Sequence, residues 1–155
     1  MRMTITADIL VVLMSWASLL AGYEYPEVMP QIRYADHSHF VEKLCEGIDT
    51  EKEPCVARAY YNDDVDAVIY LNTKYWEINR EWTPYQHSII VHEMVHYLQD
   101  LSGKYDGYEY WDDDRLCAAR KERQIEAYTT QDNFLLRVYD SRRRFPRNYS
   151  ECGWR

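Results

Sequence analysis

The chain has 155 residues, 46% of them hydrophobic, and its fifteen tyrosines and five tryptophans supply enough apolar surface for one folded domain. Its net charge of −8 argues against a nucleic-acid partner, because nucleic-acid binding relies on a basic surface. We therefore expect a single domain over residues 1–155, without a general role on nucleic acid.

An apolar run at residues 9–21 raises the question of export. The run is too short for a stable membrane span, but with Arg2 before it, it resembles a signal peptide. Against export, Asp8 stands where a positive flank is expected and Trp16 interrupts the run. We expect residues 1–21 to form the first helix of the domain, which favours a cytoplasmic protein. A signal peptide would make the protein secreted or periplasmic.

Four short segments follow. Residues 31–36, QIRYAD, are typical of a short strand, and residues 40–45 of a short helix. Residues 57–61 and 67–72, ARAYY and AVIYLN, are strand-like on either side of the turn NDDVD, so they predict an antiparallel hairpin.

The next helix has a clear beginning and a clear end. Thr83, Pro84 and Gln86 provide an N-cap, a proline at the first helical position and a capping-box partner. Gly103 is a natural stop, so we expect a helix from Pro84 to about Leu101, with Ile90, Met94 and Leu98 facing the core.

A second long helix is predicted over residues 112–140, with acidic residues in its first turn. The arginines that follow it are most simply a solvated end, favourable beside the negative pole of the helix; they are Arg142, Arg143, Arg144 and Arg147.

The four cysteines lack the CxxC spacing of a structural zinc site. In an exported protein we expect pairing of Cys45 with Cys55 and of Cys117 with Cys152, because each pair closes a modest loop. In the cytoplasm all four would be reduced thiols.

The candidate metal-binding and catalytic residues lie in the stretch HEMVHYLQ, His92 to Gln99. Residues four apart lie one above the other on a helix, so His92 and His96 can offer imidazoles to one tetrahedral ion. Glu93 is rotated by about 100° from His92 around the helix axis. It can therefore take a proton from a water bound at the open position of that ion. This is the HExxH arrangement of zinc-dependent hydrolases. We expect the remaining histidines, His37, His39 and His87, to be surface or hydrogen-bonded residues, with His37 and His39 in a loop or strand.

The HExxH helix after a strand resembles the zincin-like metallopeptidases. Residues IYLN, HEMVHYLQ and EAYTTQ, after an N-terminal apolar helix ending in GYEYP, are similar in order to segments of small, uncharacterised bacterial zincin-like proteins. The resemblance implies an edge strand that binds an extended peptide, and AVIYLN would take that place. It also implies that the N-terminal run is part of the fold.

The resemblance also implies a third zinc ligand beyond the two histidines. The metzincin subgroup is excluded, because Gln99 and Ser102 stand where it requires Gly and His. A gluzincin-type glutamate remains, for which Glu126 is our prediction. Thermolysin-like spacing favours Glu122 instead, the spacing of other gluzincins would place the ligand at Gln124, and Asp106 is an aspartate alternative.

We therefore predict an α+β, zincin-like domain with a small, mostly antiparallel sheet packed on the HExxH helix and on a long C-terminal helix. Its predicted function is that of a zinc metalloendopeptidase-like hydrolase, in which zinc-activated water cleaves a peptide or protein substrate and Glu93 is the general base. A tyrosine from residues 105–110, or Tyr128, is a candidate for stabilising the oxyanion. The alternative is a catalytically inactive zincin-fold binding or regulatory module.

Overall fold

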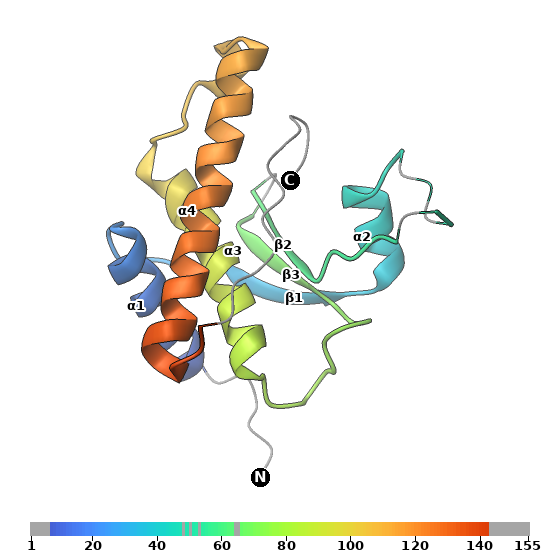
Figure 1. Ribbon diagram of the computed structural model, residues 1–155, viewed down its shortest axis with the longest axis vertical. Coiled ribbons are helices and arrows are strands. Elements are labelled where there is room, and N and C mark those ends of the chain that lie inside the picture. Colours follow the sequence, from blue (N-terminus) through green and yellow to red (C-terminus); the bar gives the residue numbers. More distant parts are fainter. Residues whose placement is uncertain (1–6, 48, 50, 53, 64–65, 143–155) are drawn as a thin grey trace.

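A computed structural model describes residues 7–47, 49, 51–52, 54–63 and 66–142 of the chain (Figure 1). In chain order, the main elements are α1 (Ala7–Ala21), β1 (Gln31–Ala35), α2 (His37–Leu44), β2 (Ala59–Asn62), β3 (Val68–Asn72), α3 (Pro84–Ser102), a 3-10 turn η1 (Tyr108–Tyr110) and α4 (Asp113–Tyr139). The chain is thus a mixed α+β protein, as the sequence predicted.

The described sheet has three strands in the order β1-β3-β2. The predicted hairpin is confirmed, because β2 pairs antiparallel with β3, with Tyr60 opposite Tyr70. However, β1 pairs with β3 in parallel, so the sheet is mixed rather than mostly antiparallel. Since β3 has a neighbour on both sides, the prediction that AVIYLN is an edge strand is wrong. Among the described strands, the edges of the sheet are β1 and β2.

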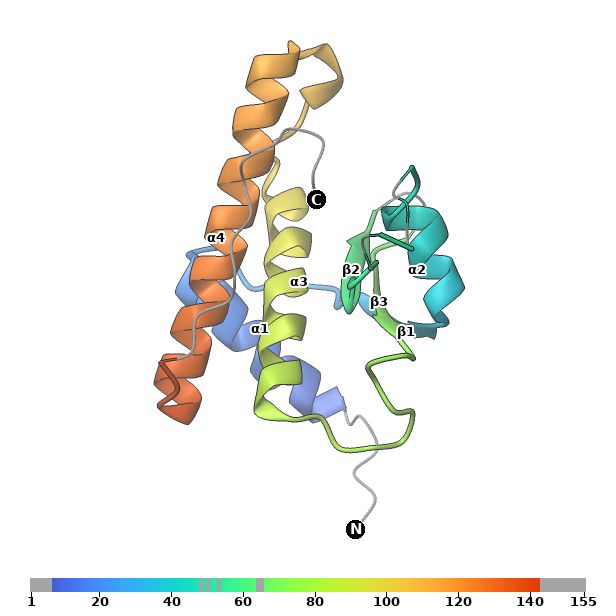
Figure 2. The same cartoon turned by 45° about the vertical axis from the view of Figure 1, so that its right-hand side comes forward.

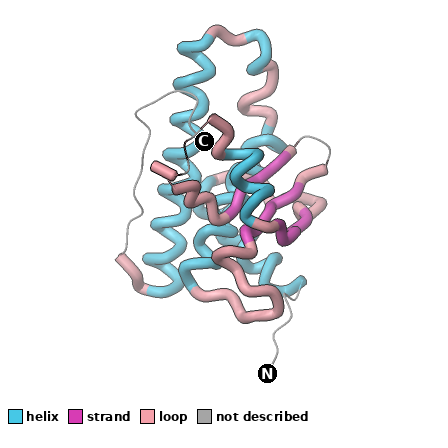
Figure 3. Tube along the Cα trace, turned by 90° about the vertical axis from the view of Figure 1, so that its right-hand side faces the viewer, coloured by secondary structure: helices cyan, strands magenta, loops and turns pink. Residues whose placement is uncertain are grey.

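The two faces of the sheet are covered by different helices. Figure 2 shows α3 between α4 and the sheet, with α2 on the far side of the strands, and Figure 3 shows the strands gathered at one side of the helices. His37 and His39 lie in α2 rather than in a loop or strand, because Asp36 caps a helix that starts earlier than predicted. Both are hydrogen-bonded, His39 Nε2 to the Tyr60 hydroxyl at 2.6 Å and His37 Nδ1 to the amide nitrogen of Asn72 at 3.0 Å.

Helix α3 is the central element of the core. Its capping box is present, with the backbone N–H of Gln86 donating to Thr83 Oγ1 at 3.2 Å and the N–H of Thr83 donating to Gln86 Oε1 at 2.9 Å. It ends at Gly103, whose φ of 74° suits a residue without a Cβ. The predicted core stripe is confirmed, since Ile90, Met94 and Leu98 are all buried. These features fix both the position and the rotation of the HExxH segment.

The N-terminal apolar run forms α1, which packs on α3 and α4. Leu13, Met14 and Ala17 are buried in the main core, and the ring of Trp16 meets Phe134 of α4 edge to face. No helix within the described residues is long and apolar enough to cross a membrane.

A disulfide joins Cys45, after α2, to Cys55, before β2, with a Cα–Cα distance of 6.0 Å. This is the first of the two pairs expected for an exported protein, and it differs from the reduced thiols expected in the cytoplasm. The second expected pair involves Cys152, and the predicted solvated arginines include Arg143, Arg144 and Arg147; these four residues lie outside the described part of the chain.

Candidate metal centre

The two histidines of HEMVH lie together on the side of α3 that faces α4. His92 is buried, with 7% of its surface exposed, and its Nε2 atom lies 3.2 Å from Nε2 of His96. The four-residue spacing on a regular helix thus brings the two imidazoles to one point, as the sequence predicted.

The proton of His92 is assigned by a chain of hydrogen bonds that starts at Tyr85. Ser88 Oγ donates to the carbonyl oxygen of Tyr85 at 2.6 Å, so the same hydroxyl accepts from Gln131 Nε2 at 3.1 Å. This orients the Gln131 amide with Oε1 towards His92 Nδ1, at 3.1 Å. Because Oε1 can only accept, Nδ1 of His92 carries the hydrogen.

Gln99 has the same effect on His96. Its Nε2 donates to the carbonyl oxygen of Arg123 at 3.1 Å, and its Oε1 accepts from Nε of Arg123 at 3.2 Å. The oxygen of this amide therefore faces His96 Nδ1, at 2.8 Å, and the hydrogen of His96 is on Nδ1.

A neutral imidazole has one N–H, and the Gln131 amide, oriented by Ser88, assigns that of His92 to Nδ1. The two Nε2 atoms then present lone pairs to each other, and Oε1 of Gln124, 3.1 Å from His92 Nε2, is a further acceptor at the same point. Burial lowers the pKa of His92 to about 3, with a further contribution from His96, and lowers the pKa of His96 to about 4. A bridging proton is therefore disfavoured. Two nitrogens about 2.1 Å from one tetrahedral zinc ion would lie about 3.4 Å apart, close to the separation of this pair. The donor set fits a zinc ion.

The third polar group at this point is the side chain of Gln124 from α4. Its Oε1 lies 3.1 Å from His92 Nε2, and its side chain also hydrogen-bonds His96. Among the described residues no three His, Cys, Asp or Glu side chains form a metal-binding group. The third donor atom that contacts the imidazole nitrogens on this side is thus an amide oxygen.

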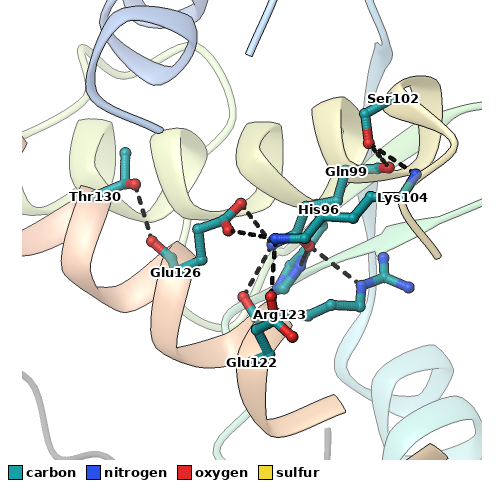
Figure 4. Close-up of polar contacts among 8 residues, drawn as sticks. All are labelled: His96, Gln99, Ser102, Lys104, Glu122, Arg123, Glu126 and Thr130. Carbon is teal, nitrogen blue, oxygen red and sulfur yellow. Dashed lines mark hydrogen bonds and ion pairs between the residues drawn. The ribbon is translucent and has the colours of Figure 1, made fainter. Parts of the chain in front are cut away.

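The predicted ligands Glu126 and Glu122 lie beside a lysine. Figure 4 shows their carboxylates directed towards Lys104, whose Nζ is 3.5 Å from Glu126 Oε2 and 2.8 Å from Glu122 Oε1. Glu126 Oε1 also accepts from Gln99 Nε2 at 3.3 Å. Glu126 is therefore connected to His96 through Gln99. The alternative ligand Asp106 lies in the turn after α3, beside Gly103.

Glu93 faces the sheet from α3. It is 8% exposed, and its carboxylate accepts a hydrogen bond from the backbone N–H of Tyr61 in β2. Burial raises the pKa of Glu93 to about 8, and the Tyr61 hydrogen bond opposes that shift. A dication near this carboxylate would lower its pKa again. The candidate base is thus anchored to the edge strand.

Three glutamine side chains contact the histidines, and only weak sequence signals point to them. Gln99 is the third residue after His96, and Gln124 and Gln131 flank the segment IEAYTT on one face of α4. Tyr128, from the same face, places its ring 4.5 Å from that of His92, edge to face. A search for ligand residue types overlooks glutamine, because carboxylates, imidazoles and thiolates are the usual ligands of zinc.

Comparison with known proteins adds no relative. No protein-family model matches the chain, and neither a curated protein nor a solved structure matches it.

Proposed function

We propose that the chain is a zincin-like, zinc-dependent metalloendopeptidase in which His92 and His96 bind the ion through Nε2. The observation that carries this proposal is the 3.2 Å separation of two Nε2 atoms whose rings both carry their hydrogen on Nδ1. Two facing lone pairs in a buried place are unfavourable, and a cation bound between them relieves this repulsion.

Glu93 is the proposed general base. When bound, zinc would acidify a water molecule and polarise a peptide carbonyl. Glu93 follows His92 directly, and the Tyr61 N–H restrains its carboxylate. Its role is to accept a proton from the attacking water and to return it to the leaving amine. For the third ligand, Glu126 remains a prediction from the resemblance. Gln124 is the residue of α4 whose side chain contacts both histidines.

The proposed substrate is an extended peptide added to the edge of β2 that faces away from β3. The N–H of Asn72 donates to the carbonyl oxygen of Arg58 at 2.9 Å, so Arg58 belongs to a hydrogen-bonded pair of the antiparallel ladder. Ala59 and Tyr61 occupy the non-hydrogen-bonded positions of the ladder, between such pairs. Their backbone N–H and C=O groups therefore point away from β3. Tyr61 uses its N–H on Glu93, so a peptide pairing with this edge would lie beside the proposed base.

The test combines metal content with hydrolysis. We expect about one zinc per chain in the gently purified protein. We also expect hydrolysis of an unstructured polypeptide such as casein that a chelator removes and added zinc restores. The double substitution of His92 and His96 by Ala should remove both properties. Absence of zinc after resupply would contradict the proposal.

Gln124 favours a second candidate function, an inactive zincin-fold module that binds a partner. Its neutral amide stands where the spacing of some gluzincins would place a carboxylate ligand. This candidate predicts a zinc-loaded protein that binds extended peptides but leaves them uncut. Chelator-sensitive cleavage would exclude it.

A further inference from the structure

We propose that Gln124 is the third protein ligand, through its amide oxygen, so that the metal site is built from three neutral side chains. This inference rests on the proposed zinc site at His92 and His96 and specifies its ligand chemistry. Oε1 of Gln124 lies 3.1 Å from His92 Nε2, and the side chain contacts His96 as well.

The geometry of α4 separates Gln124 from the glutamates. Successive residues of an α-helix turn by about 100°, so Gln124 and Glu126 point about 200° apart. Gln131, which contacts His92, lies seven residues after Gln124 and so shares its side of the helix, whereas Glu122 and Glu126 share Lys104 on the other side. The face of α4 that meets the imidazoles therefore carries amides and not carboxylates.

The contacts of Glu126 keep it in its present place. Its Oε1 accepts from Gln99 Nε2, and its Oε2 pairs with Lys104. Moving this carboxylate to the histidines would remove the acceptor of a buried amide hydrogen and would leave Lys104 with Glu122 alone. Glu126 instead supports the orientation of Gln99, which in turn orients His96.

A neutral donor set has a measurable consequence. A carboxylate ligand would offset part of the charge of a zinc ion, whereas two imidazoles and an amide leave the full charge in place. The site should therefore hold zinc less tightly than the same site with a carboxylate. Gln124→Glu is a nearly isosteric change that supplies this carboxylate at the same position.

The experiment measures the zinc dissociation constant of the full chain by competition with a chromophoric chelator. We expect Gln124→Glu to bind zinc more tightly, by about tenfold or more, and Gln124→Leu to bind it more weakly by a similar factor. Glu126→Gln is the matched control on the same helix and should change the affinity less than Gln124→Leu does. Far-UV circular dichroism of the metal-free proteins checks that each variant is folded.

The outcomes separate this inference from the proposed function. Zinc binding that depends on His92 and His96, is unchanged in Gln124→Leu, and is weakened by Glu126→Gln would overturn the Gln124 ligand and leave the zinc site intact. Failure of the wild-type chain to bind zinc would overturn both. An unchanged affinity in Gln124→Glu would also contradict the ligand assignment, because a carboxylate at a ligand position must alter it.

Discussion

Gln131 of α4 accepts a hydrogen bond from Nδ1 of His92, at 3.1 Å, although the two residues lie 39 positions apart in the chain. This contact fixes the tautomer of His92 and the rotation of its ring, because the Gln131 amide is itself oriented by Ser88. The long helix thus does more than cover the HExxH segment. It determines which nitrogen of His92 is available to an ion.

Replacing Gln131 by Leu should therefore weaken zinc binding. Loss of a hydrogen-bond partner behind a ligating histidine lowers metal affinity by about 10- to 100-fold. Gln131→Glu is the matched control, because its carboxylate still accepts from Nδ1 and should retain most of the affinity. Chelator competition measures both variants. A Leu variant with wild-type affinity would show that the ring orientation does not depend on Gln131.

Replacing Glu93 by Gln should separate metal binding from catalysis. The amide keeps the size of the side chain but cannot accept and return a proton, so we expect kcat to fall by at least about 100-fold with zinc content unchanged. Glu42→Gln, on α2 at the far side of the sheet, serves as a control with unchanged activity. Undiminished hydrolysis by Glu93→Gln would remove this residue from the mechanism.

Local signals accounted for the parts of the site that lie on a single helix. The capping residues of α3 and the spacing of His92 and His96 are properties of a short segment, and the structure agrees with them. The rotation of α4 against α3 is not local. It decides whether position 124 or position 126 meets the imidazoles, and residue type alone favours the glutamate.

The sheet illustrates the same limit. The hairpin of β2 and β3 could be predicted because its strands are close in sequence. The neighbour on the other side of β3 is β1, where Gln31 lies opposite Val68. That pairing makes β3 central and leaves β2 at the edge, and no pattern within residues 67–72 indicates it.

Removing the Cys45–Cys55 disulfide should destabilise the fold without affecting the metal. The bond closes a loop with a sequence separation of 10, for which loop-closure entropy predicts about 2–3 kcal/mol in the free energy of unfolding. We expect the double variant Cys45→Ser and Cys55→Ser to show this loss in urea titrations. Zinc affinity should stay at its wild-type value. Cys45 is the residue after α2, and α2 lies across the sheet from α3, which carries the histidines (Figure 2). A double variant as stable as the wild type would contradict the prediction.

His87 should make the stability of the fold depend on pH. Its ring is half-buried, with Nδ1 2.6 Å from the Tyr139 hydroxyl and the ring of Trp82 edge-on beside it. Nε2 is buried without a hydrogen-bond partner in the described part of the chain. Burial lowers the pKa of His87, and the charge of Glu81 opposes this shift only in part.

The direction of the effect follows from proton binding. Below the ordinary histidine pKa of about 6.5 the unfolded chain binds a proton at His87 that the folded protein does not bind. The contribution of neutral His87 to the free energy of unfolding is therefore fully present above about pH 6.5. It is lost as the pH falls towards the lowered pKa of the folded protein. The slope is at most about 1.4 kcal/mol per pH unit, the value for one proton.

The variant His87→Gln isolates this contribution. Urea titrations between pH 5 and 8 measure the free energies of unfolding of the metal-free wild type and variant. As the pH falls, the wild type should lose more stability than the variant does. His92 and His96 also have lowered pKa values in the metal-free protein, but their effect is common to both chains and cancels in the difference. Parallel curves for the two proteins over this range would show that folding leaves the protonation of His87 unchanged.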